Sequence, residues 1–402
     1  MAANTKVTPA GISGSGVVTW QSVQTTNFTA SAGKAYPVNT TSAGITVTLP
    51  STAVVGDTLQ IVDYQGTFAT NNATLNPNGL NINGTNSNAL LATKREAVTL
   101  TYIDSTQGWL LSSDSQITLT QPYTVSYLIV AGGGAGGYNN AGGGGAGGLL
   151  SSTTNLTPGT TYTITVGAGG TGNASGAGGS GTNSSITGLT AAVGGGGGGG
   201  NPGTALSGGS GGGGAGNGAG SPGGAGGSGT SGQGNAGGNN SGASYGGAGG
   251  GGAGAAGSTT PTISTPGNGG VGSITSLITT AQATTYSVGQ VVSSSVYFSG
   301  GGGGGGYSPT SMANGSGGNG GGGAGGYSAF APGTAGTANT GGGGGAEAGG
   351  GGSGTGGNGG SGCVILSVPT ANYSAITTGS PSVTTNGSNT VIIFKSSGSY
   401  TG

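Results

Sequence analysis

The chain has 402 residues but only 5 basic and 6 acidic side chains, and its formal net charge is −1. Such a weak charge produces no field that would attract nucleic acid or an anionic membrane surface, and we expect neither partner. The lack of histidine and the single cysteine, Cys363, exclude a Cys/His zinc site and an intrachain disulfide. With so few titratable groups, we expect no enzyme, no metal and no cofactor.

The first residues do not have the character of a targeting segment. The sequence MAANTKVTPAGISGSG, residues 1–16, contains no apolar stretch of the kind found in secretory signals. No run of 18 apolar residues occurs in the sequence, so we expect no membrane insertion. These features predict synthesis in a cytoplasm without export by the usual route. Residues 1–19 are small and polar, and we predict that they form an attachment arm.

Residues 20–115 carry the pattern of a β-module. The stretches 44–50, 57–64 and 97–104 alternate apolar with polar residues, and turn signals such as Asn78-Gly79 separate the apolar stretches. Short alternating strands with frequent turns are typical of two packed sheets. We therefore predict a β-sandwich-like module over this span.

Two acids of this module could in principle act together. Asp57 and Asp63 lie on or beside one predicted strand, on the same face, and glycosidases use a pair of carboxylates. Nothing else in the sequence indicates a cleft around them. We expect both side chains to face solvent.

Glycine dominates the next region, which we predict to be a glycine-rich domain over 116–369. The chain has 108 glycines, and most of them lie between 131 and 362. Apolar runs that are typical of β-strands interrupt or close the glycine tracts at 161–166, 185–193, 289–298 and 363–368. Cys363 begins the last run and is expected to be a small buried strand residue. Residues 370–402 are predicted to form a C-terminal β segment. The expected fold class is all-β.

Three structures could explain the glycine. Collagen requires glycine at every third position and abundant proline, and this chain has neither. A disordered linker is possible for glycine-serine tracts, but disordered tracts usually carry charge and these do not. The third structure is a bundle of extended segments of polyglycine-II type, in which each backbone N–H and C=O pairs with a neighbouring segment. We favour this bundle, anchored on a β-base. Its structural glycines are predicted to include Gly132, Gly133, Gly134, Gly194, Gly200, Gly300 and Gly306.

Aromatic and amide side chains stand inside or beside the glycine tracts. Aromatic rings on loops offer large, rigid contact areas and can stack on sugar rings, so these residues are candidates for receptor binding. The alternative is that the rings cap the ends of the bundle against the β-base. The candidates are Tyr138, Asn139, Asn140, Tyr245, Tyr307, Tyr327 and Phe330.

Several segments together resemble a known group of proteins. The pattern YLIVAGGGAGG, LTPGTTYTITVGAGG and GGSGCVILSVP, within about 123–369, resembles the glycine-rich domain of bacteriophage tail-fibre and virion structural proteins. The segments AYPVNTTSAGITVTLP and VTLTYIDSTQGWLL, within 35–111, are similar to a β-module of tail fibres from marine and cyanobacterial phages. The ending SPSVTTNGSNTVIIFKSSGSYTG is similar to the close of such proteins.

The resemblance implies a virion protein, namely a tail fibre or fibre-like appendage that attaches to the host surface. Its partners would be other virion proteins, through the N-terminal region, and a host glycan or outer-membrane protein. Fibres of this kind are often homotrimers. The architecture also resembles tip adhesins of T-even-like phages, in which a polyglycine-II bundle displays receptor-binding loops.

Other functions stay open at this point. A capsid decoration or head-fibre protein needs the same robustness but contacts the capsid. An ice-binding polyglycine bundle would need flat faces of regularly spaced Thr or Ala, and the interruptions here are irregular. A filament protein made by a cell is disfavoured because no secretory signal is visible.

Overall fold

The computed structural model describes residues 18–111, 122–201, 204–216, 223–240, 245–260, 265–307, 313–327, 331–350 and 354–402. The predicted arm therefore lies outside the described residues, except for its last two positions. The chain forms two compact units. Unit 1 comprises Met1–Tyr123 and Asn155–Thr160, and unit 2 comprises Thr124–Thr154 and Thr161–Gly402.

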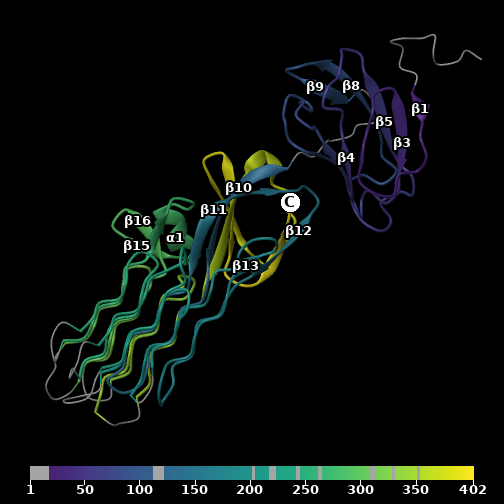
Figure 1. The fold of residues 1–402 in the computed structure, drawn as a ribbon. Coiled ribbons are helices and arrows are strands. Elements are labelled where there is room, and N and C mark those ends of the chain that lie inside the picture. Colours follow the sequence, from purple (N-terminus) through teal and green to yellow (C-terminus); the bar gives the residue numbers. More distant parts are fainter. Residues whose placement is uncertain are drawn as a thin grey trace, which may run out of the picture. The chain divides into compact units, whose positions relative to one another are not determined.

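Unit 1 consists of two sheets, drawn in purple to blue (Figure 1). The first sheet has the strand order β1-β3-β5-β8-β9, and the second has the order β2-β4-β6-β7. The first is formed by β1 (Thr19–Trp20), β3 (Lys34–Val38), β5 (Thr58–Asp63), β8 (Ala97–Asp104) and β9 (Gly108–Leu111). The second is formed by β2 (Phe28–Thr29), β4 (Ile45–Thr48), β6 (Ala73–Asn76) and β7 (Ala89–Leu91).

The two sheets of unit 1 share one apolar core. Val38 and Leu59 of the first sheet and Val47 and Leu75 of the second belong to one buried cluster. From β1 to β6 the chain alternates between the sheets, so strands next to each other within a sheet run parallel. Alternating apolar residues supply the buried faces of β4, β6 and β8, but they do not specify this parallel winding.

The expectation that Asp63 faces solvent is wrong. Its side chain is 2% exposed, at the end of β5. Its carboxylate accepts hydrogen bonds from backbone N–H groups of residues 66, 67, 68 and 95, at 2.8 to 3.2 Å. A carboxylate can be buried when several donors satisfy it, and here it organises the turn after the strand. Asp57 is half-buried and accepts from the Val54 N–H at 2.9 Å.

Unit 2 is built on three sheets, which we call the β-base. Their strand orders are β11-β10-β17-β20-β19, β13-β12-β21-β18 and β14-β16-β15. The first contains β10 (Tyr123–Val130), β11 (Leu149–Leu156), β17 (Cys363–Pro369), β19 (Ser382–Asn386) and β20 (Asn389–Phe394). The other two contain β12 (Thr161–Thr165), β13 (Ser185–Ile186), β18 (Thr377–Thr378), β21 (Gly398–Thr401), β14 (Ser273–Thr275), β15 (Gln290–Val292) and β16 (Ser295–Phe298). The described helices are α1 (Thr280–Tyr286) and the 3-10 turn Thr370–Asn372.

The core of the β-base joins segments that are far apart in the sequence. Val130 of β10 pairs with Cys363 of β17, and both side chains are fully buried. Val364 of β17 pairs with Phe394 of β20, so the C-terminal segment completes the same sheet. Burial in apolar surroundings raises the pKa of the Cys363 thiol. The all-β fold class expected from the sequence is confirmed by these sheets.

Glycine tracts leave the β-base and return to it side by side (Figure 1). The first tract, 131–138, follows β10, and its N–H groups are directed in turn to three different neighbouring tracts. This period of three is that of a polyproline-II-type helix. One neighbouring tract accepts at the carbonyls of 148, 145 and 142 from the N–H groups of 131, 134 and 137. A second accepts at 182, 179 and 176 from the N–H groups of 132, 135 and 138. The third accepts at 360 and 357 from the N–H groups of 133 and 136, and all of these bonds measure 2.8 to 3.1 Å.

The carbonyl groups of Gly132, Gly133 and Gly134 are also used. They accept from the N–H groups of residues 195, 170 and 344, each at 2.9 Å. A Cβ atom on these glycines would lie only 1.9, 2.1 and 2.2 Å from a carbonyl oxygen of an adjacent tract. Glycine is therefore required at these three positions, because carbonyl groups of adjacent tracts lie where a side chain would begin.

The other predicted structural glycines have similar surroundings. Gly300 and Gly306 donate to the carbonyls of Gly320 and Gly326, each at 3.0 Å. Gly194 donates to Asn183 Oδ1 at 2.9 Å. A Cβ on Gly200 would lie 1.8 Å from the carbonyl oxygen of Gly176. The bundle is thus held mainly by backbone hydrogen bonds between tracts rather than by side-chain packing.

Candidate functional site

The described candidate residues lie on the glycine tracts, at the end of the bundle opposite the β-base. The tract that leaves Val130 reverses at residues 138–140 and returns to Leu149. We call the group Tyr138, Asn139, Asn140, Tyr245, Tyr307, Tyr327 and Glu347 the far-end cluster. Backbone bonds hold it to neighbouring tracts: Asn201 donates to the Tyr138 carbonyl at 3.0 Å, and Gly216 donates to the Asn140 carbonyl at 2.7 Å.

Two tyrosines of the far-end cluster stack on each other. The rings of Tyr245 and Tyr307 are 4.5 Å apart between centroids, with an interplanar angle of 19°. The backbone of Tyr307 forms a parallel bridge with Gly349. Such a stack holds both rings in a fixed orientation at the end of the bundle.

Tyr327 lies on the neighbouring tract and is far more exposed. Gly306, which precedes Tyr307, donates to the carbonyl of Gly326, which precedes Tyr327. The Tyr327 side chain is 63% exposed. Tyr138, Tyr245, Tyr307 and Tyr327 all lie on glycine tracts and outside the strands of the β-base. Phe330 lies outside the described residues.

The turn that carries Asn139 and Asn140 is left-handed. Both residues have positive φ, at 61° and 53°, a conformation that asparagine tolerates better than most residues. The side chain of Asn140 is 7% exposed, and its Oδ1 accepts no hydrogen bond from any residue in the described ranges. A Cβ on Gly349 would lie only 1.5 Å from this oxygen, so any other residue at 349 would force the Asn140 side chain to move.

Glu347 holds this turn, and the sequence reasoning missed it. Its side chain is 1% exposed, and its Oε2 accepts from the Asn139 N–H at 2.9 Å. Burial raises the pKa of this carboxyl, and hydrogen bonds from the backbone at Asn139 and Gly354 partly offset the rise. The sequence feature that could have indicated this role is that Glu347 is the only acidic residue after Asp114.

The far-end cluster combines exposed and half-buried rings, two amides and one buried carboxylate. Within the described part of the chain, no group of three His, Cys, Asp or Glu side chains could hold a metal ion. None of the described helices has the length and apolar character that a membrane span requires. The chemistry at this end is therefore that of a contact surface made of rings and amides.

The extent of the glycine tracts agrees with a known domain family. The family described as a glycine-rich domain matches residues 112–369, more than half of the chain. The chain belongs to the glycine-rich domain family. Its span includes every glycine tract, the far-end cluster and the strands β10 to β17. No curated protein matches the sequence significantly.

Proposed function

We propose that this chain is a bacteriophage tail fibre or fibre-like appendage that attaches the virion to the host cell surface through the far-end cluster. The observation that carries the proposal is the convergence of Tyr138, Tyr245, Tyr307 and Tyr327 at one end of a rigid bundle, although they are separated in sequence by glycine tracts. Membership of the glycine-rich domain family supports the role of the bundle. The resemblance of the flanking segments to phage fibres supports the virion as its location.

The physical properties of the bundle suit this role. A receptor-binding surface keeps its affinity when its rings are positioned before contact, because less conformational entropy is lost on binding. Backbone bonds in three directions provide that rigidity. Tyr rings offer a broad, amphipathic contact area for a host glycan or an outer-membrane protein, which are the receptor classes that we propose.

The remaining partners are proposed on the same basis. The N-terminal region would attach to other virion proteins, and the fibre would be a homotrimer, the form in which such fibres often occur. Each protomer would then contribute one far-end cluster, and multiple weak contacts would combine by avidity.

The location is tested by immunogold labelling of the source particles with antibodies raised against the chain. Label on tail appendages is the expected result. Label on the head instead would identify a capsid decoration protein, and an unlabelled particle would overturn the virion assignment.

Attachment is tested separately with particles that carry alanine at Tyr138, Tyr307 and Tyr327. We expect host adsorption to fall at least tenfold, with the melting temperature of the purified variant within a few degrees of the parent. Particles carrying Tyr162→Ala, a change in the β-base strand β12, serve as the control. Unchanged adsorption of the triple variant would exclude the far-end cluster as the receptor site.

A further inference from the structure

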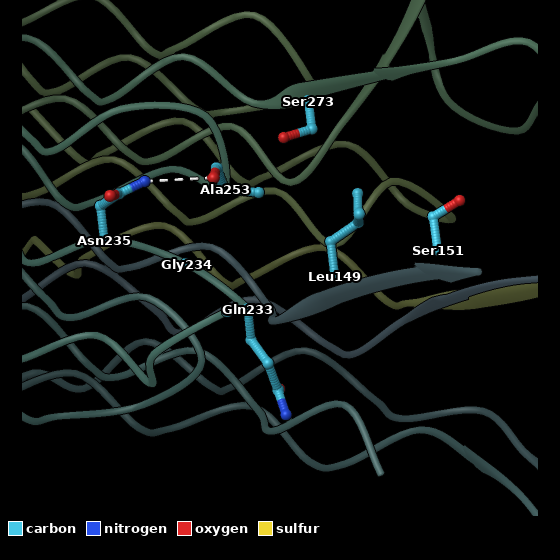
Figure 2. A pocket seen from close by; sticks show the side chains of 8 residues that line it. Leu149, Ser151, Gln233, Gly234, Asn235, Ala253 and Ser273 are labelled. Atoms are coloured by element: carbon cyan, nitrogen blue, oxygen red, sulfur yellow. Dashed lines mark hydrogen bonds between the residues drawn. The ribbon is translucent and has the colours of Figure 1, made fainter. Parts of the chain in front are cut away.

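A cavity of about 390 Å³ lies where the glycine tracts meet the β-base (Figure 2). Strand β11 supplies Leu149 and Ser151, and strand β14 supplies Ser273. The rest of the wall comes from the turn Gly232–Gly234 together with Asn235 and Ala253. The volume falls in the lower part of the range of about 300–1,000 Å³ that is usual for small-molecule sites.

The walls of this cavity are fixed by the backbone. Leu149 donates its N–H to the Gln233 carbonyl at 3.0 Å, which ties the turn to β11. Ser273 is held in register opposite Phe298 of β16. A site whose walls are already in place loses little entropy when a ligand enters.

Asn235 presents an oriented acceptor. Its Nδ2 donates to the carbonyls of Gly252 at 2.9 Å and Ala253 at 3.1 Å, as the dashed line to Ala253 marks in Figure 2. These two bonds assign the nitrogen and fix the plane of the amide. The Oδ1 atom is then the part of this side chain that can accept a hydrogen bond from a ligand.

Gln233 contributes only backbone to the cavity. Its side chain extends away from Leu149 and Ser273 in Figure 2, and its Oε1 accepts from the Val193 N–H at 2.7 Å. Its Nε2 donates to the Ala191 carbonyl at 3.0 Å. The polar side chains left to line the cavity are therefore Ser151, Ser273 and Asn235, all neutral.

The lack of charge in the lining restricts the ligand. After Asp114 the sequence has only two charged residues, Glu347 and Lys395. Glu347 lies in the far-end cluster, and Lys395 Nζ donates to the Tyr286 carbonyl at 3.0 Å. A charged ligand would lose hydration without gaining a counter-ion, whereas a hydroxyl-rich ligand could replace its water contacts with those of serine, amide and backbone groups.

We propose that this cavity binds one unit of a neutral carbohydrate. Leu149 and Ala253 provide a small apolar surface for the C–H groups of the ring, and Ser151, Ser273 and Asn235 Oδ1 provide hydrogen bonds to its hydroxyls. The site is separate from the far-end cluster and does not depend on the proposed receptor function.

The test measures binding of methyl glycosides of neutral hexoses, with methyl glucuronide as the charged comparison, to the full chain by saturation-transfer NMR and titration. We expect millimolar binding of at least one neutral glycoside and at least tenfold weaker binding of the glucuronide. Ser151→Phe fills the cavity and should abolish binding. Ser152→Phe is the matched control, because strand alternation directs that exposed side chain to the other face of β11.

A second variant covers the case in which Ser151→Phe disturbs folding. Ser273→Ala removes one hydroxyl and should weaken binding several-fold without changing the melting temperature. Tyr162→Ala, on β12 and outside the cavity lining, should leave glycoside binding unchanged. The proposal is overturned if no neutral glycoside binds, if the glucuronide binds equally well, or if folded Ser151→Phe protein binds like the parent.

Discussion

The backbone N–H of Asn139 donates a 2.9 Å hydrogen bond to the carboxylate of Glu347, a residue 208 positions further along the chain. This bond joins the turn at the end of the first glycine tract to one of the last tracts. Because Glu347 is buried in a region almost without charge, its ionised form is destabilised by the loss of hydration.

The raised pKa of Glu347 predicts a pH-dependent stability. A carboxyl whose pKa is higher in the folded than in the unfolded state stabilises the fold most when it is protonated. This contribution is present below the unfolded value of 4.5 and is lost as the pH rises through the folded pKa. The difference in the free energy of unfolding between the parent and Glu347→Gln should therefore shift in favour of the parent as the pH falls from 7 to 4. Melting temperatures of both proteins across this range test the sign, and parallel curves would contradict it.

Gly133→Ala should destabilise the bundle strongly. The new Cβ would lie 2.1 Å from the Gly342 carbonyl oxygen, so adjacent tracts would have to separate. We expect a loss of about 3 kcal/mol or more, at the upper end of overpacking effects. Gly179→Ala is the control, because its nearest contact would be 3.0 Å. Urea unfolding gives the free energy of unfolding of both variants. A small and equal loss in the two variants would argue against tight backbone packing at Gly133.

Asp63→Asn should destabilise unit 1. The carboxylate accepts four backbone N–H groups, and an amide supplies one acceptor oxygen and an NH₂ group that cannot accept. Leaving buried donors unsatisfied costs about 1–3 kcal/mol. Asp57→Asn, at a half-buried position with a bond to Val54, should have a smaller effect in the same unfolding experiment. The reverse order would contradict the role assigned to Asp63.

The stack of Tyr245 and Tyr307 should give a measurable coupling energy. Aromatic pairs contribute about 0.5–1.5 kcal/mol beyond the area that they bury. A double-mutant cycle with alanine at both positions should therefore show coupling in that range. The same cycle between Tyr245 and exposed Tyr327 is the control and should give a value near zero. Absence of coupling in the first cycle would show that the rings do not stack in solution.

Local pattern was sufficient for part of this fold. Alternation of apolar residues predicted β4, β5 and β8 of unit 1, and the apolar run that begins at Cys363 became the buried strand β17. The scarcity of charge and the length of the glycine tracts indicated a bundle, because glycine alone permits such close backbone contact. These properties depend on neighbouring residues or on composition, which a sequence displays directly.

Only the tertiary structure decided which distant residues meet. The parallel winding of unit 1, the burial of Asp63 and the bond between Asn139 and Glu347 depend on contacts across many positions. The neutral cavity likewise forms from strands and turns that lie far apart in the chain. Most positions of the glycine tracts carry no side chain that would specify a partner. The arrangement of the tracts in the bundle is set by the positions at which each tract leaves the β-base and returns to it, because hydrogen bonds between backbones are the same for every pair.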